Sequence, residues 1–162
     1  MRRRYVAIAV LVSILLLGSV AALPGGRALV VADAETGEQY MTVPVEDGTT
    51  VALEYMHSVE KTRVYDEYTV RGDHLDMTRM EFESFGWGLP SGANVTREDG
   101  VYVFDPPGNY TRVTVSPGDI AGHKLHVGAE TYDLVARTNG RSVHLYVTRR
   151  SAFGAATDQF NT

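Results

Sequence analysis

A histidine, a serine and two carboxylates lie close together in the sequence and carry the groups that hydrolytic chemistry uses. His57 is followed directly by Ser58, and Asp66 and Glu67 lie within ten residues of the histidine. A histidine takes up a proton near neutral pH, a serine hydroxyl attacks a carbonyl carbon, and a carboxylate orients the imidazole ring. One hypothesis is therefore a small hydrolase that uses His57 with a nearby carboxylate.

The spacing of these residues favours a structural role instead. Residues 50–57 alternate as a strand does, so the adjacent side chains of His57 and Ser58 point to opposite faces. The sequence has no Gly-x-Ser-x-Gly turn of the kind that presents a nucleophilic serine. We therefore predict no catalytic residue. We expect His57 to donate a hydrogen bond that closes the end of the core, while Ser58 begins a turn.

A pair of histidines raises the question of a metal site. His123 and His126 are three residues apart within a strand-like pattern. That separation on a strand places the two side chains on opposite faces of a sheet. The chain contains no cysteine, which excludes thiolate metal sites and disulfide bonds. We predict no metal site and no cofactor.

The elements that position these residues are predicted to be strands. After Pro24-Gly25-Gly26, short runs of β-branched and aromatic residues alternate with turns that contain glycine. We expect strands at residues 28–32, 39–45, 50–57, 63–71, 74–82, 94–98, 101–104, 110–115, 124–127, 131–138 and 141–148. Strands at this spacing without helical periodicity predict an all-β fold, either an antiparallel sandwich or a partly open barrel.

The Gly72-Asp73 turn predicts a hairpin between residues 63–71 and 74–82. In that register the apolar pairs are Val70 with Leu75 and Tyr68 with Met77. The apolar parity then changes, which predicts a β-bulge near Thr78-Arg79.

Two later turns of the same kind predict two further hairpins. Asp99-Gly100 joins residues 94–98 to 101–104. Asn139-Gly140 joins residues 131–138 to 141–148, which places Leu134 opposite Leu145 on a buried face. His144 then lies on the solvated face.

The first 26 residues have the composition of a membrane anchor or signal segment. Arg2-Arg3-Arg4 precedes an apolar run of about 19 residues, close to the ~20 that span a bilayer as a helix. Positive charge before such a run holds the N-terminus in the cytoplasm and directs the chain beyond the run out of the cell. Ser19-Val20-Ala21 also offers a cleavage site, so a single-pass membrane anchor, which we favour, and a secreted protein both stay open. We expect an extracytoplasmic β domain at residues 27–150 and a loose tail at residues 151–162.

The charge of the exported domain excludes one class of partner. The chain carries a net charge of −5 at pH 7, which becomes −8 without the three arginines Arg2-Arg3-Arg4. A domain of that charge repels phosphate backbones, so we expect no binding of nucleic acid.

Two sequence blocks in fixed order resemble the family called domain of unknown function 1850. They are Tyr55-x-His57-Ser58-Val59, continued by Val64, Glu67 and Tyr68, and Phe82-x-Ser84-Phe85-Gly86-x-Gly88-Leu89-Pro90. The resemblance implies a membrane-anchored outer domain with an accessory role beside a TRAP-type solute transporter of the TAXI class. The implied partner is the permease or its solute receptor. The binding or motif candidates are Tyr55, His57, Ser58, Glu67, Gly86, Trp87, Gly88 and Pro90.

Two further features concern the surface. Trp87 is the only tryptophan and lies between two glycines, where the family often has a small residue. A loop tryptophan of this kind either plugs the end of the core or forms a contact surface. Asn94 and Asn109 each begin an Asn-x-Thr sequon and are candidate glycosylation sites.

Overall fold

The computed structural model describes residues 24–84 and 95–151. Residues Ala28–Thr148 form one compact unit. The second unit, residues 1–27 and 149–162, contributes to the described ranges only the start of the first strand and the end of the last one. Residues 1–23 of the predicted membrane segment lie outside the described residues, whereas its last three residues, 24–26, begin the first strand. Gly86, Trp87, Gly88, Pro90, Asn94 and residues 152–162 of the predicted tail also lie outside the described residues. Within the described ranges, no helix has the length and apolar character needed to cross a bilayer.

The described chain consists of strands and one short helix. The strands are β1 (Pro24–Asp33), β2 (Gln39–Val45), β3 (Thr50–Met56), β4 (Arg63–Arg71), β5 (His74–Phe82), β6 (Thr96–Glu98), β7 (Val101–Phe104), β8 (Gly108–Tyr110), β9 (Val113–Val115), β10 (Lys124–Val127), β11 (Glu130–Asp133) and β12 (Val143–Ser151), and the helix is α2 (Leu134–Thr138). The predicted all-β class is therefore confirmed.

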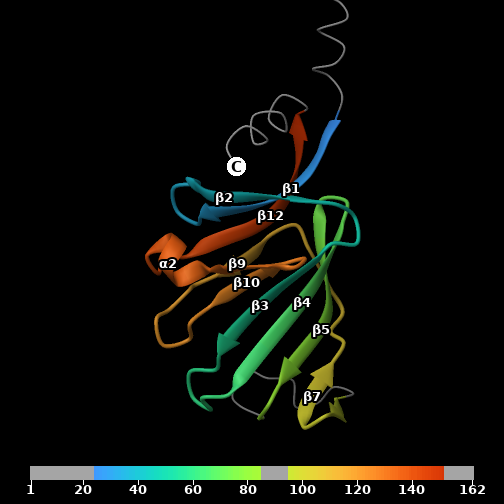
Figure 1. Ribbon diagram of the computed structural model, residues 1–162, viewed down its shortest axis with the longest axis vertical. Coiled ribbons are helices and arrows are strands. Elements are labelled where there is room, and N and C mark those ends of the chain that lie inside the picture. Colours follow the sequence, from blue (N-terminus) through green and yellow to red (C-terminus); the bar gives the residue numbers. More distant parts are fainter. Residues whose placement is uncertain (1–23, 85–94, 152–162) are drawn as a thin grey trace, which may run out of the picture. The chain divides into compact units, whose positions relative to one another are not determined.

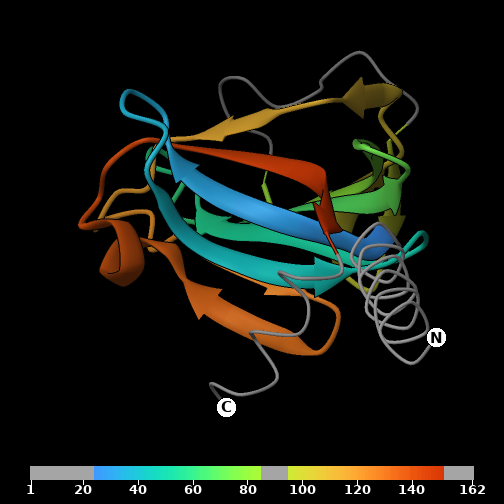
Figure 2. The same ribbon diagram turned by 90° about the horizontal axis from the view of Figure 1, so that it is seen from above.

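The strands form two sheets (Figure 1). One has the order β2-β1-β12-β9, and Figure 2 shows β1 (blue) beside β12 (red) in this sheet. The other has the order β11-β10-β3-β4-β5-β7-β6, with β8 paired to β5. The pairs from β10 to β5 along this sheet are antiparallel, as predicted. At the lower end of Figure 1, strands β3, β4 and β5 extend beyond the four-stranded sheet.

A single apolar core joins the two sheets, as in a β-sandwich. The four-stranded sheet contributes Leu29 and Val31 of β1 and alternate residues of β12. The larger sheet contributes Val51 and Leu53 of β3, with alternate residues of β4 and β10. Because strand side chains alternate between faces, each strand buries one stripe against the other sheet.

The β4–β5 hairpin has the predicted register. Val70 lies opposite Leu75 and Tyr68 lies opposite Met77. The next pair is Glu67 with Arg79, which leaves Thr78 as the extra residue of the predicted bulge. The β6–β7 hairpin also forms at Asp99-Gly100, with Glu98 opposite Val101.

The predicted hairpin at Asn139-Gly140 is wrong. Asp133 ends β11 and caps a helix, because its carboxylate accepts a hydrogen bond of 3.0 Å from the backbone N–H of Ala136. Asn139 and Gly140 have positive φ angles of 51° and 72°, and they end α2 instead of joining two strands. Residues with positive φ serve both type I′ turns and helix C-termini, so the dipeptide alone does not distinguish them.

This correction separates the two leucines that were predicted to pair. Leu134 begins α2, whereas Leu145 lies opposite Val113 of β9. Both leucines are nonetheless fully buried. His144 is half-buried on the other face of β12, and its Nδ1 lies 3.0 Å from the hydroxyl of Thr114.

We expect Leu145→Ala to lower the free energy of unfolding by about 2–5 kcal/mol, because it empties a fully buried site in the core. His144→Ala is the neighbouring control and should cost about 1 kcal/mol or less, since it removes one exposed hydrogen bond. Urea denaturation of both variants measures the difference. Equal losses would contradict the assignment of the two faces of β12.

Candidate functional site

The end of β3 is where the core gives way to an open surface. β3 is hydrogen-bonded to β4 on one side and to β10 on the other, and its residues Val51–Leu53 are buried. Tyr55 is half-buried, and Met56 is 39% exposed. The backbone N–H of Met56 donates to the carbonyl of Ala121 at 2.8 Å, which ties the turn at residues 118–122 to the strand.

His57 organises the turn that follows β3. Its backbone N–H donates to the carbonyl of Thr62 at 2.8 Å, and its carbonyl accepts from the N–H of Lys61 at 3.0 Å. The ring Nδ1 accepts from the N–H of Glu60 at 3.3 Å. In these bonds the ring of His57 accepts within the turn, and Ser58 is exposed at the start of the same turn.

The second family block begins beside this turn. Ser84 is the last described residue before the gap, and its hydroxyl donates to the carboxylate of Glu60 at 3.3 Å. The N–H of Glu83 also donates to the carbonyl of Arg63 at 3.4 Å. The fold thus brings the start of the second block to the turn that contains the first.

A pocket of about 370 Å³ lies between the end of β3 and the turn at residues 118–122. We call it the β3 pocket, and it is lined by Glu54, Tyr55, Met56, Arg63, Ile120, Ala121, Gly122 and Lys124. Ile120 is 75% exposed at its edge. The lining combines apolar side chains with two cations and one carboxylate, which suits a ligand or side chain of mixed character.

Asp66 is a carboxylate on the core-facing stripe of β4. It lies opposite Leu53 of β3 and is only 8% exposed. Its Oδ2 accepts a hydrogen bond of 3.3 Å from the hydroxyl of Tyr55. Its Oδ1 is buried and has no hydrogen-bond partner among the described residues. Burial disfavours the charged form and raises the pKa of Asp66 to about 6, against the opposing effect of the bond from Tyr55.

Tyr55 connects Asp66 to the β3 pocket. Its ring is stacked on the ring of His123, with a centroid separation of 5.0 Å and an interplanar angle of 14°. Burial lowers the pKa of His123, so this imidazole is neutral at neutral pH. Tyr55 also lines the β3 pocket, so a single hydrogen bond links the carboxylate of Asp66 to a residue of the pocket wall.

The pairing of His57 with Asp66 or Glu67, which the hydrolase hypothesis requires, is not formed in the described residues. Asp66 is bonded to Tyr55 on the core face. Glu67 points to the opposite face, where its carboxylate accepts from the hydroxyl of Thr78 at 3.3 Å. Neither carboxylate is hydrogen-bonded to His57, so these contacts give the hydrolase hypothesis no support.

The outer face of the larger sheet carries a ladder of alternating charges across five strands. Its members in spatial order are Lys124, Glu54, Arg63, Glu81, Arg79 and Glu98, with neighbours 2.8–3.5 Å apart. Each pair is partly exposed and contributes little stability by itself. Together they neutralise a face that is otherwise open to solvent.

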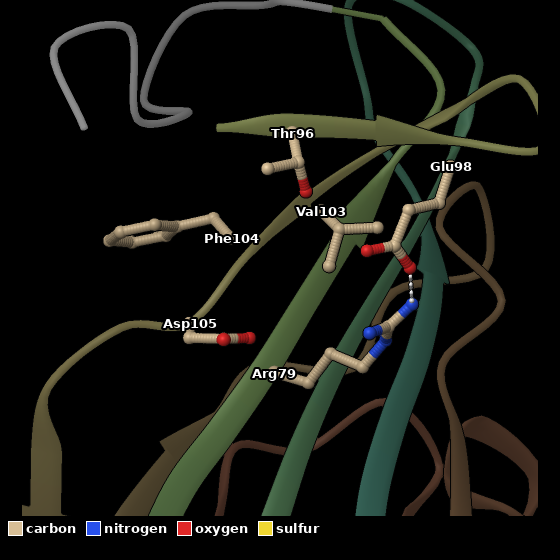
Figure 3. A pocket seen from close by; sticks show the side chains of 6 residues that line it. All are labelled: Arg79, Thr96, Glu98, Val103, Phe104 and Asp105. Carbon is tan, nitrogen blue, oxygen red and sulfur yellow. Dashed lines mark hydrogen bonds and ion pairs between the residues drawn. The ribbon is translucent and has the colours of Figure 1, made fainter. Parts of the chain in front are cut away.

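A second cavity of about 320 Å³ lies at the end of this ladder (Figure 3). Val103 lies near the middle of the lining side chains, and the carboxylate of Asp105 and the guanidinium of Arg79 lie on different sides of it (Figure 3). Arg79 is already bound to Glu81 at 2.8 Å and to Glu98 at 2.9 Å. Its charge is therefore satisfied within the protein, which makes the cavity a weak site for an anion.

The two histidines considered as a metal site lie on opposite faces. His123 is stacked on Tyr55 on the core side, whereas His126 lies beside Glu54 on the outer side, 3.8 Å from its carboxylate. No group of three or more metal-ligating side chains is found in the described ranges.

Residues 51–134 match a family model described as a domain of unknown function (DUF1850), which is more than half of the 162-residue chain. The chain belongs to this family. The matched segment runs from β3 to the first residue of α2 and contains Asp66 and every residue that lines the β3 pocket. A search of curated proteins and a search of solved structures gave no match.

Two features of this site were not predicted as parts of it. Asp66 shares its parity with Val64, Tyr68 and Val70, so alternation along β4 places it on the buried stripe. That signal is visible in the sequence. Ile120 has no comparable signal, because long-range contacts bring its turn to β3: the pairing of β10 with β3 and the hydrogen bond between Met56 and Ala121.

We expect Asp66→Asn to change how stability depends on pH. The folded protein holds the Asp66 proton more tightly than the unfolded chain, whose pKa is near 3.8. The penalty for burying the charge is therefore absent below about pH 4, grows between pH 4 and 6, and persists above that range. It amounts to roughly 3 kcal/mol. Urea denaturation of both proteins from pH 4 to 7.5 should show the variant gaining up to that amount relative to the wild type; a difference independent of pH would contradict the prediction.

Proposed function

We propose that this protein is a membrane-anchored extracytoplasmic binding module that acts beside a TRAP/TAXI-type solute transporter. The observation that carries the proposal is the gathering of exposed apolar side chains around the end of β3. In the described residues, Met56, Val59 and Ile120 are 39%, 64% and 75% exposed. We call these three residues the β3-end patch.

The β3-end patch has the composition of a contact surface. Of the four large hydrophobic residues that the described chain exposes, three belong to it. Met56 and Ile120 line the β3 pocket, and Val59 lies in the turn directly after β3. Apolar groups clustered around a pocket and bordered by charged residues are typical of sites that become buried by a partner. A binding role needs no catalytic group at this surface.

The class of partner follows from the N-terminal sequence and the family. The apolar run after Arg2-Arg3-Arg4 supports a single-pass anchor with the domain outside the cytoplasm. The family resemblance supports an accessory role to a transporter. We therefore infer that the β3-end patch contacts the transporter permease or its solute receptor.

Topology can be tested with single cysteines, because the natural chain has none. Thr42→Cys places a thiol at an exposed position of β2. On intact cells, a membrane-impermeant maleimide should label this variant fully. Arg3→Cys, which keeps two N-terminal arginines, should be labelled only after the membrane is permeabilised. The reverse pattern would place the β domain in the cytoplasm.

The contact itself can be tested by photo-crosslinking in native membranes. A photoreactive residue at position 120 should form a crosslink to a transporter permease or solute receptor, identified by mass spectrometry. The same residue at position 42 is the matched control and should form none, because Thr42 is exposed on the other sheet. Equal crosslinking from both positions, or no transporter component at position 120, would overturn the proposed function.

A further inference from the structure

Asp66 and Asp33 are the two buried aspartates of the described chain, and they differ in how many hydrogen bonds their carboxylates accept. Asp33 is 2% exposed, and its carboxylate accepts bonds from Tyr40, Arg141 and the backbone N–H groups of the turn after β1. These donors, Arg141 foremost, hold the pKa of Asp33 below its usual range. Asp66 has one donor, Tyr55, and its second oxygen is buried without a partner in the described residues.

A buried carboxylate with an unpartnered oxygen costs free energy, and a hydrophobic side chain at that position would avoid the cost. The neighbours of Asp66 in the sheet are Leu53 and Met80, which supply no polar group from their side chains. Ionisation of Asp66 at this position therefore destabilises the folded protein, and protonation of the carboxylate removes that destabilisation.

The titratable groups around Asp66 are tyrosines and one histidine. Tyr55 of β3 bonds it, Tyr68 lies next to it on the same face of β4, and Tyr110 of β8 packs edge-on against Tyr68. Burial raises the pKa of Tyr55 and of Tyr68, and both hydroxyls stay protonated. The ring of His123 is stacked on that of Tyr55, and burial lowers the pKa of His123. No arginine or lysine among the described residues is bonded to the carboxylate.

We propose that Asp66 is a proton-binding site that controls the β3 pocket through Tyr55. When Asp66 is ionised, the Tyr55 hydroxyl donates a charge-assisted hydrogen bond to Oδ2 and the ring is held in the pocket wall. When a proton from solvent binds the carboxyl, the acceptor is neutral and the bond is weaker. The Tyr55–His123 stack and the adjacent Met56 are then free to shift, so acid changes the surface that a partner meets. This inference deepens the proposed function, but its test needs no partner.

Methionine methyl groups are well placed to report this coupling. Met80 lies opposite Asp66 in the β4–β5 register, Met56 lines the β3 pocket, and Met41 lies on β2 in the other sheet. The full chain, labelled with ¹³C at the methionine methyls and held in detergent micelles, is titrated from pH 4.5 to 8. The Met80 and Met56 signals should move with a common midpoint near pH 6, while Met41 stays in place.

Two variants separate this coupling from the titration of nearby histidines. Asp66→Asn should abolish the movement of both signals. Tyr55→Phe keeps the ring and removes only the hydroxyl; Met80 should still titrate in it, while Met56 should not. Movement of Met56 that survives in either variant would assign it to His57 or His123 and overturn the proposal, as would a wild-type Met56 signal that does not move. Failure of the crosslinking experiment alone would remove the proposed partner and leave this coupling intact.

Discussion

The pairing of β3 with two neighbours is the constraint on which the rest of the domain depends. β4 and β10 hold the strand from both sides, so Leu53 lies between Asp66 and Leu125. This registration fixes the core stripe of the larger sheet and sets where that stripe ends, at Tyr55. It also directs Met56 outward, into hydrogen-bond contact with Ala121. A shift of one residue would exchange the faces of the strand and turn Glu54, its member of the charged ladder, toward the core.

The two buried aspartates show how the same residue type serves different ends. Asp33 joins the β1–β2 turn to Arg141, far along the chain, and its oxygens are satisfied by several donors. It stabilises the fold at neutral pH, and that contribution is lost as acid protonates it. Asp66 has the opposite effect on stability: because it is buried with a single donor, its ionised form destabilises the fold relative to its protonated form. Such groups are characteristic of functional sites rather than of cores built for stability.

Local signals account for what the sequence predicts well. The β4–β5 hairpin follows from a two-residue turn and strict alternation, and the extra residue Thr78 follows from the break in that alternation. The Asn139-Gly140 turn misled because its positive φ angles suit a helix end equally well, and the deciding bond lies upstream, from Ala136 to Asp133. The turn that was expected to begin at Ser58 forms directly after β3.

The candidate site was less predictable, because long-range contacts assemble it. The β3 pocket exists only where the turn containing Ile120 meets Met56, more than sixty residues away in the chain. No periodicity within either segment encodes that meeting. Asp66 was considered as a partner for His57, whereas the fold pairs it with Tyr55. Side-chain parity could place Asp66 on the core face, but only the register between β3 and β4 reveals its partner.

Amide hydrogen exchange, measured on the membrane-extracted protein with and without the proposed transporter component, tests the central claim most directly. If the end of β3 is the contact surface, the partner should slow exchange in residues 56–62 and 118–122, the two segments that carry the β3-end patch. Exchange in the β6–β7 hairpin, residues 96–104, should stay the same, because it lies at the edge of the larger sheet. Protection confined to that hairpin or to β2, with the two segments unchanged, would contradict the account.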